Sequence, residues 1–161
     1  MKFKKLPLLM LAVFVFDAVA GESPAPFQEE TLEQIEARYL GQPFVLMLWS
    51  IHCAPCFAEL KMLGEEFVAQ PDLPVVLVST DPEVTTGEVV MLLQDYGLGD
   101  FYSWQFAGDF PERLRYLIDP DWYGELPRSY FYTATGERRP HTGVISREML
   151  LEWLVDTGSE G

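Results

Sequence analysis

The sequence predicts an α/β fold in which a central mixed β-sheet is flanked by helices on both faces. Three observations support this prediction. Residues 44–51 (FVLMLWSI) and 73–79 (LPVVLVS) are almost wholly apolar, as in strands that are covered on both sides of a sheet. Amphipathic runs with helical spacing alternate with these strands. Nearer the C-terminus, two extended runs flank the turn sequence ATGE, which indicates a β-hairpin.

The first predicted helix covers residues 31–40, where apolar residues recur at helical spacing and Thr31 with Gln34 suggests a capping box. The buried strand over residues 44–51 follows it. This strand leads directly into a helix over residues 54–69, whose first turn tolerates a proline because its amides have no intrahelical partner.

The middle of the chain continues the alternation of strands and helices. Residues 73–79 form the second buried strand, and residues 80–82 (TDP) are predicted to cap a helix over residues 83–96. An extended piece at 102–106 and a helical turn at 111–118 fill the next stretch.

The last elements are a hairpin and a helix. The hairpin strands are predicted over residues 129–133 and 138–144. Ser146 then caps an amphipathic helix whose apolar positions include Leu150 and Trp153.

Cys53 and Cys56 are the only cysteines, and their C-A-P-C spacing lies where a predicted strand gives way to a helix. A thiol at the first turn of a helix meets the positive end of the helix dipole, which stabilises its thiolate. The second thiol, one turn further on, stays protonated until it resolves a mixed disulfide. This arrangement predicts a thiol-disulfide exchange site.

Other uses of two closely spaced cysteines fit the sequence less well. Haem attachment requires a histidine after the second cysteine, where this chain has Phe57. Structural zinc requires four ligands, and His52 and His141 are the only histidines. An inert disulfide would close so short a loop that it would remove little entropy from the unfolded chain. We therefore expect a redox-active pair with no bound metal or cofactor.

Residues 1–20 are predicted to be an export signal, with three lysines, an apolar stretch and the small-residue pattern AVA at its end. We expect cleavage before Gly21, a flexible leader over 21–30 and a single domain over 31–161. The alternative is an uncleaved membrane anchor, although the apolar stretch is shorter than the roughly 20 residues that cross a bilayer.

The formal net charge is −14, which disfavours binding to nucleic acids and to anionic membranes. An exported chain lives where thiols oxidise, and structural disulfide scaffolds use more cysteines than two. We expect a periplasmic monomer whose cysteine pair is active rather than structural.

Three segments resemble the thioredoxin-like superfamily, in particular its exported reductases of the TlpA, ResA and CcmG type. They are VLMLWSI running into HCAPC, the proline of ELPRSYFY, and the closing TGVISREMLLEWL. The resemblance implies a thioredoxin fold. The long separation between Cys53 and Pro127 is similar to the insertion that is typical of the TlpA-like proteins.

The resemblance also implies roles for individual residues. Cys53 is the expected nucleophile and Cys56 the resolving thiol. Pro127 is the expected cis-proline that faces them, with Leu126 presenting its backbone to the substrate and Trp49 packing beneath the site. For Pro127 the alternative is an ordinary trans proline that opens a strand.

Other positions near the motif match the family less closely. Glu59 matches an acid that could accept the proton of Cys56, or it lies on a solvated helix face. Met47 replaces the buried aspartate of cytosolic thioredoxins. His52 precedes the first cysteine, where its imidazolium could stabilise the thiolate or simply be an exposed loop group. Arg128 could bring a positive charge towards the thiols.

These features predict an extracytoplasmic thiol-disulfide oxidoreductase. By resemblance, it would reduce cysteine pairs in client proteins of cytochrome c maturation or copper-site assembly and be re-reduced by a membrane electron donor. The alternative is a copper-handling chaperone that binds Cu(I) through Cys53, Cys56 and His141. A peroxidase is a third alternative, but the sequence lacks the Thr-x-x-x-Cys pattern of a peroxidatic cysteine. A binding module with a vestigial cysteine pair is a further alternative.

Overall fold

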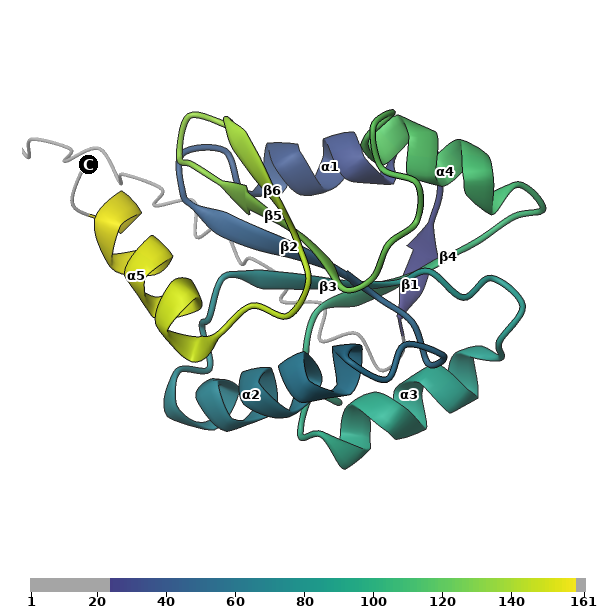
Figure 1. The fold of residues 1–161 in the computed structure, drawn as a ribbon, viewed down its shortest axis with the longest axis horizontal. Helices are drawn as coiled ribbons and strands as arrows, with labels where there is room; N and C mark the ends of the chain where they lie inside the picture. The colour runs from purple at the N-terminus through teal and green to yellow at the C-terminus, as the bar shows by residue number, and fades with distance from the viewer. Residues whose placement is uncertain (1–23, 159–161) are drawn as a thin grey trace, which may run out of the picture.

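The structure, a computed structural model, describes residues 24–158, in which six strands form one sheet (Figure 1). The strands are β1 (Ala25–Phe27), β2 (Phe44–Trp49), β3 (Val75–Ser79), β4 (Ser103–Phe106), β5 (Arg128–Tyr132) and β6 (Arg138–Thr142). The helices are α1 (Thr31–Arg38), α2 (Cys56–Ala69), α3 (Thr86–Asp95), α4 (Pro111–Ile118) and α5 (Arg147–Gly158). The predicted export signal over residues 1–20 lies outside the described residues.

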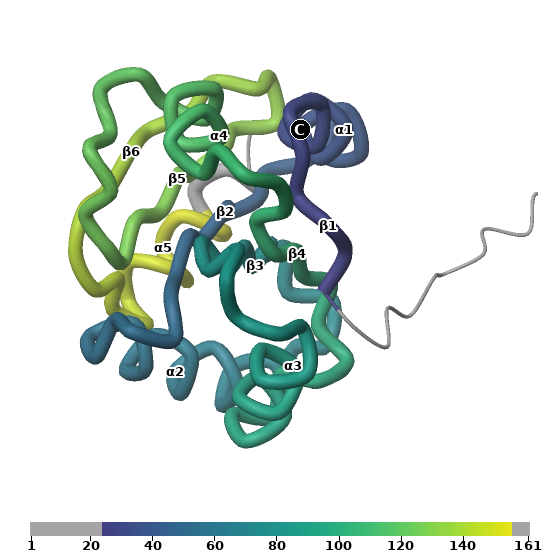
Figure 2. The backbone as a smooth tube through the Cα atoms, turned by 90° about the vertical axis from the view of Figure 1, so that its right-hand side faces the viewer, coloured from purple at the N-terminus to yellow at the C-terminus, as the bar shows by residue number. Residues whose placement is uncertain are grey.

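The order of strands across the sheet is β1-β4-β3-β2-β5-β6. The pairs β1–β4, β4–β3 and β3–β2 are parallel. Strand β5 is antiparallel to both of its neighbours, β2 and β6. Figure 2 shows β1 at one side of the sheet and the hairpin at the other. The predicted class, a mixed sheet in an α/β fold, is confirmed.

Helices cover both faces of the sheet, as predicted. Apolar side chains of α2, α3 and α5 pack on one face with the β2 residues Val45, Met47 and Trp49. Side chains of α1 and α4 pack on the other face with Leu46 and Leu48. All of β2 is buried, which explains why its sequence is apolar without alternation.

Residues 25–27 form a strand where the sequence analysis expected a flexible leader over 21–30. Ala25 pairs with Trp104 and Phe27 with Phe106 in parallel register. The ring of Phe27 is buried, and its centroid lies 5.4 Å from that of Phe106. The leader prediction is therefore wrong for these residues, because burying Phe27 and pairing with β4 hold them in the sheet.

Two helix starts also differ from prediction. Thr31 and Gln34 form no capping box, and the Thr31 hydroxyl instead accepts a hydrogen bond from the Gln28 amide. Helix α3 begins later than expected, because Thr85 caps it and forms a capping box with Glu88. The predicted cap over residues 80–82 has a different role, described below.

Each edge strand carries a proline: Pro26 lies in β1 and Pro140 lies in β6. Most of β6 is exposed, including Arg138 and Arg139. Within residues 24–158, no helix is long and apolar enough to span a membrane.

Candidate thiol-disulfide site

Cys53 and Cys56 form a disulfide, with Cα atoms 5.3 Å apart, in the loop between β2 and the start of α2. Their environments differ. Cys56 is fully buried, whereas Cys53 is half-buried. The Cys56 amide donates a hydrogen bond to Sγ of Cys53 over 3.3 Å, so the first turn of α2 directs an N–H at this sulfur. Cys53 is thus the sulfur that a partner molecule can reach.

The Leu126–Pro127 peptide bond is cis, so the cis prediction is confirmed and the trans alternative is excluded. Its position follows from the sheet. Leu48 near the end of β2 pairs with Arg128 at the start of β5, so the residues before β5 lie beside the end of β2. Figures 1 and 2 both place this segment near the loop that carries the disulfide.

A third segment, residues 143–145, completes the surroundings of the cysteines. The Gly143 amide donates to the Pro127 carbonyl over 2.9 Å. The Ile145 amide donates to Glu59 Oε1 over 2.5 Å. Val144, which lies between these two anchors, is 44% exposed. The glycine between the last strand and the last helix was the sequence signal for this segment, but its contact with Glu59 was not predicted.

Glu59 lies one turn after Cys56 on α2 and has no exposed surface. Its Oε2 atom is buried and has no hydrogen-bond partner. Burial raises the pKa of Glu59 to about 7, with the hydrogen bond from Ile145 acting in the opposite direction. A solvated helix face is therefore excluded, and the carboxyl group can both hold and release a proton near neutral pH.

Trp49 and Met47 lie in the core beneath the site. Both are fully buried in the same apolar cluster as Cys56. The resemblance placed an aromatic side chain under the cysteines at Trp49, and the structure brings it there. Met47 fills the core with an apolar side chain, so Glu59 is the buried carboxyl group of α2 next to the motif.

The residue that sequence reasoning missed is Asp81. It was assigned to a helix cap, but its carboxylate accepts hydrogen bonds from Ser50 Oγ at 2.6 Å, Ile51 N at 2.9 Å and Ser79 Oγ at 2.8 Å. Ser50 and Ser79 are the polar residues at the ends of two apolar runs, and this was the available signal. We call Ser50, Ser79 and Asp81 the Asp81 network.

The side chain of His52 is exposed on the loop before Cys53, and its amide donates to Ser50 Oγ over 3.0 Å. This position agrees with the exposed-loop interpretation. A role of the imidazole towards the thiolate stays a prediction.

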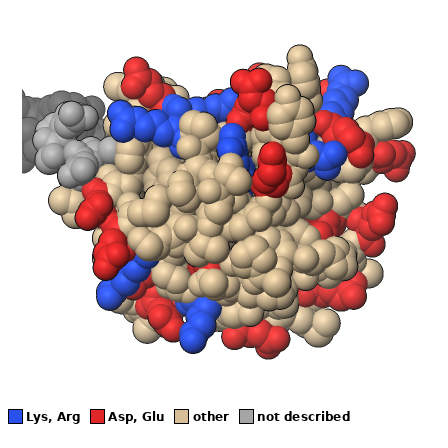
Figure 3. All heavy atoms as spheres, viewed as in Figure 1, with Lys and Arg blue, Asp and Glu red and all other residues tan. Residues whose placement is uncertain are grey.

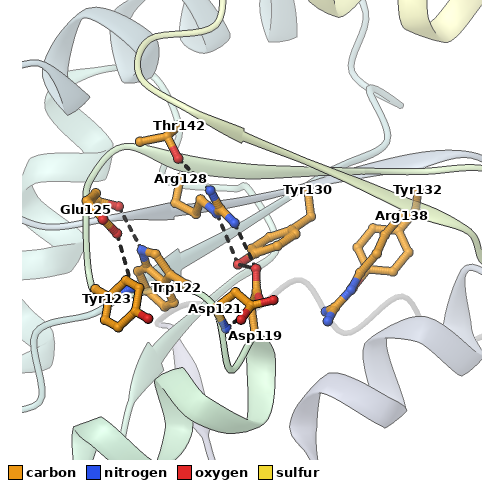
Figure 4. A network of polar contacts seen from close by, with 10 residues as sticks. All are labelled: Asp119, Asp121, Trp122, Tyr123, Glu125, Arg128, Tyr130, Tyr132, Arg138 and Thr142. Atoms are coloured by element: carbon orange, nitrogen blue, oxygen red, sulfur yellow. Dashed lines mark hydrogen bonds and ion pairs between the residues drawn. The ribbon is translucent and has the colours of Figure 1, made fainter.

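Arg128 does not carry its charge towards the thiols, and this expectation was wrong. Its guanidinium pairs with Asp119 at 2.8 Å and donates to Tyr130 and to Thr142 (Figure 4). Because Arg128 pairs with Leu48 in the register, its side chain lies on the sheet face of α1 and α4, opposite to that of Cys56. The network of Figure 4 instead anchors the chain that leads to Pro127.

His141 does not join the cysteines. It lies on β6, where its ring meets Phe131 edge-on at 6.5 Å, and it lines a surface cavity of about 310 Å³ beside α5. Among the described residues, no three His, Cys, Asp or Glu side chains are grouped as metal ligands. The copper alternative therefore finds no third ligand in this part of the chain.

No protein-family model and no curated protein sequence matches the chain. Solved structures do match it. A secreted Mycobacterium tuberculosis disulfide oxidoreductase homologous to E. coli DsbE is 21% identical, over 76% of this chain and 85% of that one, with a TM-score of 0.56. A thio-disulfide isomerase from Thermus thermophilus is 22% identical, over 74% of this chain and 81% of that one, with a TM-score of 0.57.

A third structure, a thiol:disulfide interchange protein of the thioredoxin family from Chlorobium tepidum, is 14% identical, over 76% of this chain and 83% of that one, with a TM-score of 0.57. The chain has a thioredoxin-like fold. In this thioredoxin-like fold, β3, α3, β4 and α4 account for the long separation between α2 and Pro127.

Proposed function

We propose that the protein is a thiol-disulfide oxidoreductase that reduces disulfides in client proteins. The observation that carries the proposal is the unequal burial of the two cysteines at the start of α2. Cys53 is partly exposed on the loop after β2, near which the register places the residues before β5, whereas Cys56 is buried one turn before Glu59 on α2. A nucleophile has to be reached by its substrate, and a resolving thiol does not.

The proposed reaction begins with the reduced pair. The Cys53 thiolate attacks one sulfur of a client disulfide, forms a mixed disulfide and releases the other client sulfur as a thiolate. Cys56 gives its proton to Glu59 and attacks Sγ of Cys53. The second client thiolate then leaves, and the Cys53–Cys56 disulfide forms. Two electrons have passed from the protein to the client.

The pair has to be reduced again before the next cycle. A dithiol donor supplies two electrons and two protons to the Cys53–Cys56 disulfide and is itself oxidised. By resemblance, we propose a membrane protein as this donor. Clients of the cytochrome c maturation or copper-site assembly type follow from the same resemblance.

The surface around Cys53 suits an apolar client segment. Pro55 and Val144 are exposed, and Leu126 is half-buried. Figure 3 shows one face of the molecule, on which charged side chains lie mainly at the periphery and the middle is largely uncharged. We propose that an extended client peptide lies beside Cys53 and pairs with the Leu126 backbone, as in strand addition.

We propose that the protein acts outside the cytoplasm as a monomer. The N-terminal export pattern over residues 1–20 supports a location outside the cytoplasm. The secreted M. tuberculosis oxidoreductase with a similar structure agrees with this location.

The test is a trapping experiment with two serine variants. In C56S the mixed disulfide cannot be resolved, so a client peptide that carries a disulfide should accumulate in covalent complex with Cys53. In C53S no complex should form and disulfide reduction should fall by more than about 100-fold, since Cys56 is buried. Gel shift and mass spectrometry measure the complex. Reduction by C53S at the wild-type rate would overturn the proposal.

A further inference from the structure

The Asp81 network lies where the ends of β2 and β3 meet the loop that carries Cys53. The side chain of Asp81 is buried, with 7% of the residue exposed. It accepts three hydrogen bonds, two of which come from Ser50 and Ile51, the residues that follow β2. The third comes from Ser79 at the end of β3.

From this carboxylate, a chain of hydrogen bonds reaches the nucleophile. Ser50 Oγ donates to Asp81 and accepts the His52 amide, and the Ser50 carbonyl accepts the Cys53 amide over 3.1 Å. The amides of three consecutive residues, 51 to 53, are therefore directed at Asp81 or Ser50. None of these three hydrogen bonds ends on the Cys53 sulfur, which receives the amide of Cys56 instead.

Asp81 is itself held by the neighbouring strand. The Gln105 side chain on β4 donates to the carbonyls of Asp81 and Val84, both over 2.7 Å. The preceding residue, Thr80, donates its amide to the Trp49 carbonyl over 2.8 Å. The carboxylate is thus a fixed group that three strands support.

We propose that Asp81 is a positioning residue that keeps the Cys53–Cys56 pair reducing. This inference rests on the proposed function. Two effects act in the same direction. The network engages the amides of residues 51 to 53, so these amides are not available to stabilise the Cys53 thiolate. The buried negative charge near the loop also disfavours a thiolate. A less stable thiolate means a less stable reduced form, and hence a lower reduction potential.

The first test replaces Asp81 with asparagine, which keeps the shape and removes the charge. D81N should lower the pKa of Cys53, read from thiolate absorbance. It should also shift the equilibrium with glutathione about tenfold towards the reduced pair, which is about 30 mV for a two-electron couple. S50A keeps the charge but breaks the link to the His52 amide, so it should move both quantities in the same direction by less.

A remote variant controls for loss of stability alone. Y132F removes a hydrogen bond from the Tyr132 hydroxyl to Glu36, on the opposite face of the sheet, and should leave the potential unchanged. If D81N and S50A folded and kept the wild-type potential and Cys53 pKa, Asp81 would be merely structural and the inference would fail. If the wild-type pair did not exchange with glutathione at all, the proposed function would fail instead.

Discussion

Glu59 is a carboxyl group in a place where an apolar side chain would be expected. It is fully buried in the helix that carries Cys56, and one of its oxygens has no hydrogen-bond partner. Burying such a group costs free energy, mainly in its ionised form. A cost of this kind is typical of residues that serve catalysis rather than stability.

The substitution E59Q tests this cost. In the folded protein burial raises the pKa of Glu59 from 4.5 to about 7, so between these pH values the folded state binds more protons than the unfolded state. The free energy of unfolding of the wild type therefore falls as the pH rises through this range. E59Q should lack this fall and gain up to about 3 kcal/mol over the wild type between about pH 5 and about pH 8.

Urea unfolding of the oxidised proteins at both pH values measures the difference. E65Q, at an exposed position of the same helix, controls for the loss of one acidic residue. Parallel pH profiles for the wild type and E59Q would mean that Glu59 ionises as it does in the unfolded chain.

Individual site residues were predictable to different degrees. Cys53 and Cys56 stand in a short sequence motif whose chemistry is local, whereas Pro127 was expected from the resemblance; the structure brings all three to one end of the sheet. Asp81 was not predictable, because its partners come from two strands that are distant in sequence. Arg128 was misjudged for a similar reason. The face on which its side chain lies is set by its register with Leu48.

At the scale of elements, α2 and the end of α3 approach each other closely at Gly64. A Cβ atom at this position would lie 1.9 Å from the Tyr96 carbonyl oxygen. Because this neighbour is backbone, it cannot move without shifting the end of the helix. The contact explains a glycine in the middle of a helix, where it would otherwise be unfavourable.

The substitution G64A should therefore destabilise the protein by about 3 kcal/mol, through the forced separation of the two helices. G87A is the matched control, since no heavy atom lies within 4 Å of its added Cβ and the residue is in a helix. It should be neutral or stabilise by up to about 1 kcal/mol. Urea midpoints of the oxidised proteins give both values, and equal midpoints for the two variants would contradict the close approach.

Most elements could be predicted because their signals are local. Residues 44–51 and 73–79 are apolar throughout, and 111–118 was predicted with the bounds of α4. Strand β1 could not be predicted from the sequence, because three residues are too few to show a periodicity and because Pro26 weakens a strand prediction. Its partner, β4, lies far along the chain.

For the whole molecule, β1 closes one side of the sheet and buries Phe27 between β4 and α1 side chains. F27A should cost about 4 kcal/mol, as is usual for removing a buried aromatic ring. P26A, at an exposed position of the same strand, should change stability by less than about 0.5 kcal/mol. The midpoint temperatures of thermal unfolding of F27A, P26A and the wild type measure these differences in stability. Equal stability of F27A and the wild type would contradict the burial of Phe27 and favour the original expectation of a flexible leader.

The prolines of the two edge strands limit how other chains can pair with the sheet. Pro26 and Pro140 donate no amide hydrogen, and Arg138 and Arg139 add charge to β6. Incompletely folded chains tend to extend any free sheet edge. Because both edges of this sheet are interrupted in this way, the client contact that we propose is confined to Cys53 and its surroundings, and the sheet itself offers other chains little to extend.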